Sequence, residues 1–190
     1  MTVTATRVAA RPDVRPALLV VAAVGVLLSR EWILGTPDAT RIVLLAGVYG
    51  AVLTASLLVP TALDRARLHP AVALGLGLAA VGMAAFAGGR PPAAPLGVTA
   101  LPLALFAAVA EEALFRRTAY GWLARHGAAL AVVGSALLFA AIHVPLYGAA
   151  AFPVDLGAGL LLSWQRWASG TWTVPAATHA AANLLAVMMR

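Results

Sequence analysis

Cysteine and lysine are absent from this chain of 190 residues, and only seven residues are acidic. The absence of cysteine excludes disulfide bonds and thiol catalysis, and it leaves no sign of the redox compartment. Charged residues make up only 11% of the chain, whereas hydrophobic residues make up 62% and the mean hydropathy is +0.92. These values lie far outside the range of soluble domains. The sequence therefore predicts a protein that folds in lipid.

The cationic side chains, all thirteen of them arginines, give the chain a net charge of +6. No basic run is interleaved with aromatic residues, so we expect no nucleic-acid partner. In a membrane protein, arginines in connecting loops set the orientation. With seven crossings, the side of the N-terminus holds Arg7, Arg11, Arg15, Arg65, Arg67, Arg116, Arg117, Arg125 and Arg166, and the other side holds Arg30, Arg41, Arg90 and Arg190. This excess predicts a cytoplasmic N-terminus.

Hydrophobic segments along the whole chain predict an all-α transmembrane bundle of about six to eight helices, since a helix needs about 20 apolar residues to cross a bilayer. They cover residues 17–34, 42–63, 71–87, 96–115, 128–144, 149–165 and 172–189. In the first segment, Arg30 and Glu31 would have to reach the membrane interface. In the sixth, Pro153 and Asp155 predict a broken or re-entrant helix. We expect a single membrane domain.

Polar and titratable residues are few inside the later segments, and each is costly there. A carboxylate at the middle of a membrane helix costs about 2.5–3.5 kcal/mol on insertion scales, yet two glutamates stand side by side. The set comprises Glu111, Glu112 and Arg116 on the fourth segment, His143 on the fifth, Asp155 on the sixth, and His179 and Asn183 on the seventh. Because unpaired polar groups are expensive in lipid, we expect these side chains to turn inward and pair.

Helical spacing separates the roles of the two glutamates. Arg116 follows Glu112 by one helical turn, and glutamate four residues before a cation is the favourable order for an ion pair. We therefore expect Glu112 and Arg116 to form a structural ion pair. Glu111 points to a different face and has no local cation. It is predicted to be the free carboxylate and the better candidate for chemistry.

The remaining polar residues predict a hydrolase. His179 and Asn183 share one helix face and could both donate hydrogen bonds to a developing oxyanion. His143 is followed by Pro145, which disfavours a continued helix, so we expect it near a helix end that water can reach. Glu111 would act as the general base on a water molecule that His143 holds or whose proton it shuttles.

Each element also has a structural interpretation. A lone histidine in a membrane helix often forms only a helix–helix hydrogen bond. An isolated Glu–Arg pair is more often structural than catalytic, and we expect Asp155 to cap or break the sixth segment, outside the site. The joint occurrence on separate helices favours function, because ionisable groups within a membrane usually serve one.

Three short motifs carry a resemblance to a known family. They read Glu111-Glu112-Ala113-Leu114-Phe115-Arg116, Phe139-Ala140-Ala141-Ile142-His143, and His179-Ala180-Ala181-Ala182-Asn183. In this order the chain resembles the CAAX-protease and bacteriocin-processing (CPBP) intramembrane proteases, which include the CAAX prenyl endopeptidase. The resemblance spans residues 96–189 and leaves residues 1–95 as helices without a motif.

The resemblance implies an intramembrane endopeptidase that hydrolyses a membrane-anchored protein or peptide, with a cavity that opens to the membrane and the cytoplasm. It implies the same roles for Glu111, His143, His179 and Asn183. The family has been described both as glutamate proteases and as metalloproteases. A zinc ion would need three ligands, which Glu111, His143 and His179 could supply. We favour the metal-free mechanism without a cofactor, because no His-Glu-x-x-His helix is present.

Two other functions stay open at this point. The chain could be a non-catalytic immunity or scaffold protein that keeps the motifs for packing. It could also be a proton-coupled transporter, since intramembrane glutamate and histidine serve as proton relays, although no inverted repeat is visible. For all three, we expect an integral protein of a bacterial plasma membrane that contacts membrane lipids.

Overall fold

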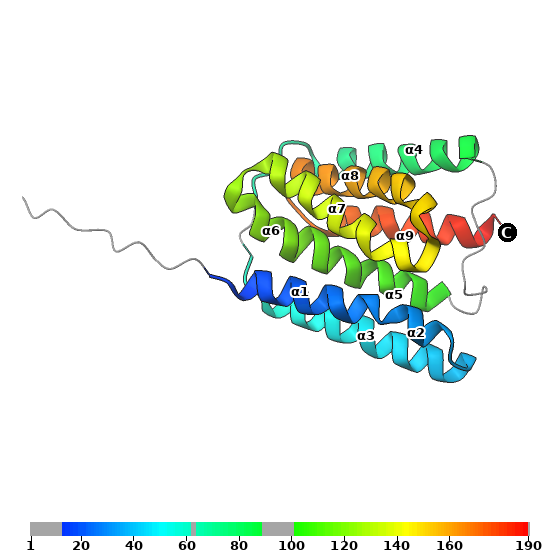
Figure 1. Ribbon diagram of the computed structural model, residues 1–190. Helices are drawn as coiled ribbons and strands as arrows, with labels where there is room; N and C mark the ends of the chain where they lie inside the picture. Colours follow the sequence, from blue (N-terminus) through cyan, green and yellow to red (C-terminus); the bar gives the residue numbers. More distant parts are fainter. Residues whose placement is uncertain (1–12, 62–63, 89–100, 190) are drawn as a thin grey trace, which may run out of the picture.

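The computed structural model describes residues 13–61, 64–88 and 101–189, and within these ranges the chain is a bundle of helices without a strand (Figure 1). The predicted all-α class is therefore confirmed. Residues 96–100 of the fourth predicted segment, and the arginines Arg7, Arg11, Arg90 and Arg190, lie outside the described residues.

Each of the seven predicted segments corresponds to one helix or to consecutive helices. The α-helices are α1 (Arg15–Leu28), α2 (Arg30–Leu34), α3 (Asp38–Leu58), α4 (Pro70–Gly88), α5 (Leu101–Glu112), α6 (Tyr120–Leu123), α7 (Ala128–Tyr147), α8 (Phe152–Ser169) and α9 (Thr173–Met188). A π-helix, Ala113–Ala119, joins α5 to α6, and short 3₁₀ turns at Ala124–His126 and Ala149–Ala151 precede α7 and α8. The fourth segment thus continues well past its predicted end.

Four helical stretches in the described part of the chain are long and apolar enough to cross a membrane: Arg15–Leu34, Asp38–Leu58, Pro70–Ala87 and Ala128–Tyr147. Large apolar side chains such as Trp32, Leu58 and Phe86 are exposed on the outside of the bundle, as expected where lipid is the solvent. The chain is thus an integral membrane protein. Helices α5, α8 and α9, which carry most of the polar candidates, are not among the four stretches.

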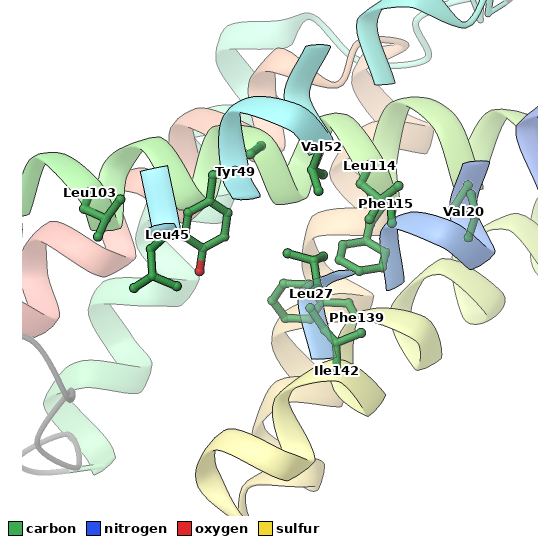
Figure 2. Packing of buried hydrophobic residues seen from close by; sticks show 13 residues of the cluster. Val20, Leu27, Leu45, Tyr49, Val52, Leu103, Leu114, Phe115, Phe139 and Ile142 are labelled. Carbon is green, nitrogen blue, oxygen red and sulfur yellow. The ribbon is translucent and has the colours of Figure 1, made fainter. Parts of the chain in front are cut away.

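A hydrophobic core ties the N-terminal helices to the helices that carry the motifs (Figure 2). Leu27 of α1 and Val52 of α3 belong to the same buried cluster as Phe115 of the π-helix and Phe139 of α7. The rings of Phe115 and Phe139 meet edge to face, with centroids 5.8 Å apart. On the other side of the bundle, α4 packs against α8 and α9. The site is therefore enclosed by helices from both halves of the chain.

Two expectations about helix ends are wrong. Pro145 does not end α7, which continues to Tyr147 and stops at Gly148, where φ is +81°. Pro153 does not break the sixth segment, because it lies in the first turn of α8, where its missing N–H is not needed. Asp155 follows in that same turn without capping the helix, so its predicted capping role is wrong as well.

Candidate active site

The two glutamates are the last residues of α5, and the π-helix follows them directly. Glu111 is 3% exposed and Glu112 is fully buried, so both carboxylates face the inside of the bundle. π-Helices are rare and frequently occur at functional sites. Here the wider turns place Arg116 in the protein interior one turn beyond Glu112.

Glu111 is not the free carboxylate that helical spacing predicts. Its Oε1 accepts a hydrogen bond from Nη1 of Arg30 at 2.5 Å, and the two groups form a buried ion pair. Arg30 itself is only 2% exposed, so the expectation that it reaches the membrane interface is also wrong. The partner was missed because it lies 81 positions earlier in the chain, on another helix.

His143 faces the second oxygen of Glu111. Its Nε2 lies 3.8 Å from Oε2 of Glu111, and its Nδ1 lies 2.8 Å from the carbonyl oxygen of Phe139. Because a carbonyl oxygen can only accept, Nδ1 carries the hydrogen and donates it. In the neutral imidazole, Nε2 is then an acceptor that faces the carboxylate. We call Arg30, Glu111 and His143 the Glu111 set.

The second carboxylate also has an arginine and a histidine as partners. Nη1 of Arg116 donates to Oε1 of Glu112 at 2.9 Å, so the predicted ion pair is present, and both side chains are fully buried. The same oxygen lies 3.0 Å from Nδ1 of His179. Oε2 of Glu112 has no hydrogen-bond partner. We call Arg116, Glu112 and His179 the Glu112 set.

His179 and Asn183 lie one turn apart on α9, and each is tied to α5. The contact between His179 and Glu112 was not expected from the sequence. Nδ2 of Asn183 donates to the carbonyl oxygen of Ala104 at 3.0 Å, which uses one of its two amide hydrogens. The ring nitrogen Nε2 of His179 and the other amide hydrogen of Asn183 are left for a further ligand.

These residues open onto a cavity of about 240 Å³ among α4, α7, α8 and α9. His143, His179 and Asn183 line it, and most of the other lining residues are apolar, among them Val81 and Leu162. These three candidate residues, which come from α7 and α9, therefore line one cavity, as the sequence predicts, whereas Glu111 and Glu112 lie behind the histidines and are not among its described lining residues.

Asp155 also lines this cavity, although the sequence interpretation left it out of the site. Its Oδ2 is buried without a hydrogen-bond partner. The signal that could have included it is its chemistry, because an acidic residue in a hydrophobic segment needs a reason to be there. Asp155 was left out of the site because it was expected to cap or break the helix.

No group of three His, Asp or Glu side chains in the described ranges is arranged to hold a metal ion. The ligand set that the sequence left open, Glu111, His143 and His179, is thus not assembled. The choice between metal-free and metal-dependent hydrolysis stays a prediction.

The fold and the site define a class: an integral membrane bundle with a cavity lined by two imidazoles and an amide, each imidazole next to a buried carboxylate. Residues 93–185, about half of the chain, match the family model described as type II CAAX prenyl endopeptidase Rce1-like. This region matches the CAAX protease family, so the resemblance seen in the motifs is confirmed. No curated protein and no solved structure matches the chain significantly.

Proposed function

We propose that the protein is an intramembrane endopeptidase in which Glu111 activates a water molecule to cleave a peptide bond. The observation that carries the proposal is the gap between Oε2 of Glu111 and Nε2 of His143, which face each other 3.8 Å apart in the buried part of the bundle. Hydrogen bonds to water are about 2.8 Å long, so one water molecule can bond to both atoms from the side of the gap. Membership of a protease family supports the same reaction.

In the proposed reaction, Oε2 of Glu111 removes a proton from this water while its oxygen attacks the scissile carbonyl carbon. The carbonyl π bond breaks and its oxygen becomes the oxyanion of a tetrahedral intermediate. The intermediate then collapses, the C–N bond breaks, and the leaving nitrogen takes the proton held by Glu111. Nε2 of His143, an acceptor in the neutral ring, orients the attacking water through its second hydrogen.

Asn183 and His179 are placed to stabilise the oxyanion. Asn183 retains one amide hydrogen beyond the one that it donates to Ala104. His179 already donates from Nδ1 to Glu112, so its Nε2 can donate only when the ring is an imidazolium. The carboxylate of Glu112 is the negative charge that would stabilise this imidazolium.

We favour chemistry without a metal for an electrostatic reason. The guanidinium of Arg30 occupies Oε1 of Glu111, so a zinc ion bound by this carboxylate would lie next to a fixed positive charge. For the substrate we propose a membrane-anchored protein or peptide, because apolar side chains dominate the wall of the cavity.

The test begins with mass spectrometry of membrane proteins from cells with and without the gene, which identifies a cleaved sequence. An internally quenched, lipid-anchored peptide with that sequence then reports turnover by the purified protein. Glu111→Gln should lower kcat by roughly 10²–10⁴-fold, the usual contribution of a general base. Glutamine can still accept the hydrogen bond from Arg30, so the fold should be retained, which thermal unfolding checks.

The matched control is Glu31→Gln, because Glu31 is exposed and one position from Arg30. It should leave turnover unchanged. Full activity of Glu111→Gln would refute the proposed mechanism. Loss of wild-type activity with a zinc chelator, and its recovery with added zinc, would refute the metal-free form.

A further inference from the structure

Arg30 lies outside the matched region of the chain, yet its guanidinium is buried at the candidate site. It begins α2, directly after Ser29, where the first membrane segment changes from α1 to α2. The matched region begins only at residue 93. A helix without any family motif therefore supplies a charged group to the carboxylate proposed as the base.

Each nitrogen of this guanidinium has an acceptor. Nε donates to the carbonyl oxygen of Leu27 at 2.8 Å, and Nη1 donates to the hydroxyl of Tyr49 at 3.0 Å as well as to Glu111. Nη2 donates to the carbonyl oxygen of Ile142 at 3.4 Å. Figure 2 shows Leu27, Tyr49 and Ile142 on three different helices. By contrast, Nε of the equally buried Arg116 has no partner.

The contact with Ile142 links Arg30 to the second half of the proposed catalytic pair. Ile142 directly precedes His143 in α7. One rigid, planar group thus holds Oε1 of Glu111 on one side and the backbone next to His143 on the other. Because Oε1 is occupied, Oε2 is the oxygen directed to His143. The width of the gap in which water would bind depends on this link.

Stability alone is a weak reason for such an arrangement. Replacing a buried ion pair by well-packed apolar residues is often neutral or stabilising. A lysine could supply the charge, but its ammonium is a point donor without the fork that reaches several acceptors in one plane. The geometry requires an arginine, and the element that it arranges is the gap between Glu111 and His143.

We infer that Arg30, held in place by Tyr49, is a positioning residue for the hydrolytic reaction: it fixes the carboxylate of Glu111 relative to His143. The inference rests on the proposed function. It makes the N-terminal helices α1 to α3 part of the catalytic unit, so that the matched region does not contain a complete site.

The experiment compares Arg30→Lys and Tyr49→Phe with the wild type, using the same quenched, lipid-anchored peptide. Misplacement of a catalytic group by about 1 Å can cost about 10²-fold in rate. We expect Arg30→Lys to lower kcat by roughly 10–100-fold and Tyr49→Phe by roughly 3–10-fold. KM should stay within about twofold, because neither residue lines the cavity.

The matched control is Arg117→Lys. Arg117 is a partly buried arginine that donates to carbonyl oxygens at the end of α3, among them that of Val59, and it forms neither a hydrogen bond nor an ion pair with Glu111 or Glu112. It should leave kcat unchanged while lowering the midpoint of thermal unfolding by a few degrees. If Arg30 is a positioning residue, Arg30→Lys should lower kcat much more than Arg117→Lys does, even when the two variants unfold at similar temperatures.

An unchanged kcat in both Arg30→Lys and Tyr49→Phe would overturn the inference. So would a fall in kcat that Arg117→Lys reproduces, because the effect would then be one of stability only. If Arg30→Lys does not fold, Tyr49→Phe decides by the same criterion, since it keeps the ion pair. If Glu111→Gln is inactive and these variants are fully active, only the inference fails; an active Glu111→Gln refutes the proposed function itself.

Discussion

The Glu111 set and the Glu112 set each combine a glutamate, an arginine and a histidine, and the two glutamates are neighbours in the sequence. We call the Glu112 set closed, because both of its partners contact one carboxylate oxygen, and the Glu111 set open, because its partners face different oxygens. In the Glu112 set, arginine and histidine both contact Oε1, at 2.9 and 3.0 Å. In the Glu111 set, arginine takes Oε1, and histidine lies 3.8 Å from Oε2. Only the second arrangement offers two acceptors, Oε2 of the glutamate and Nε2 of the histidine, that one water molecule can bridge from the side. Two adjacent glutamates can thus differ in role, because the partners of Glu112 share one carboxylate oxygen whereas those of Glu111 face both.

The two sets also differ in where their arginines come from. Arg116 is four residues from Glu112 on the same helical stretch, so this pair forms as soon as the helix does. Arg30 reaches Glu111 only after α1 and α2 have packed against α3 and α7. The pair of Glu112 with Arg116 is therefore local, and the whole Glu112 set lies within the matched region. The Glu111 set depends on tertiary structure contributed by the N-terminal helices.

The largest expected effect is a loss of kcat when the histidine of the open set is replaced. His143→Gln should lower kcat by roughly 10²–10⁴-fold, because the flexible glutamine side chain does not hold an acceptor where Nε2 of the imidazole orients the attacking water for Glu111. The hydrogen bond from Nδ1 goes to a carbonyl oxygen of its own helix, so its loss should change the midpoint of thermal unfolding little. Turnover of the quenched peptide and thermal unfolding in detergent measure both quantities.

The control for this histidine is His126→Gln, since His126 is exposed in the turn before α7. It should change neither turnover nor stability. Equal turnover of His143→Gln and His126→Gln would mean that the open set is no more catalytic than the protein surface.

A second variant tests whether the closed set stabilises the fold. Arg116→Met removes the cation from Glu112 and leaves a fully buried carboxylate without its countercharge, which we expect to lower the free energy of unfolding by about 3–5 kcal/mol. The double variant Glu112→Gln/Arg116→Met should recover part of this loss. Thermal or denaturant unfolding of the purified variants measures both changes.

Arg125→Met serves as the control, because the exposed Arg125 donates hydrogen bonds, among the residues that the structure describes, only to the carbonyl oxygens of Trp122 and Asp13. A change below about 0.5 kcal/mol is usual for such surface positions. If Arg116→Met were as stable as Arg125→Met, the Glu112 set would not be the structural element that its burial indicates.

A third variant asks whether the closed set also takes part in chemistry. His179→Gln should lower kcat by roughly 10²–10³-fold if Nε2 stabilises the oxyanion, which is the usual effect of removing one such donor. It should also cost stability, because the contact with Glu112 is lost. An unchanged kcat together with lower stability would assign His179 entirely to structure and leave Asn183 as the oxyanion donor.

The parts of this protein that the sequence could predict are local. Hydropathy found the helical segments, and spacing found the pair of Glu112 with Arg116, because both depend on residues within one helix. The motifs also predicted that His143, His179 and Asn183 meet inside the bundle, because polar groups in lipid turn inward to find partners, and the three residues line one cavity. These conclusions needed no knowledge of how the helices pack.

The parts that it could not predict depend on contacts between distant helices. Nothing near Arg30 in the sequence points to Glu111, and its position near the end of a hydrophobic segment favoured the interface instead. Arg30, Arg116 and Arg166 were counted as loop arginines for the orientation, but all three are buried. The cytoplasmic position of the N-terminus stays a prediction that rests on the remaining arginines.

The smallest expected effect concerns Asp155, which lines the cavity without a hydrogen bond to either set. Asp155→Asn keeps the shape of the side chain and removes its charge, so turnover should fall by less than about tenfold. The unfolding midpoint should stay level or rise, because a buried carboxylate oxygen without a partner is costly and a neutral amide is less so. Asp38→Asn, at an exposed position, is the control. A fall in turnover of about 10²-fold would be as large as the usual contribution of a general acid or base. It would show that Asp155 takes part in the reaction together with His143, and the open set would then have four members.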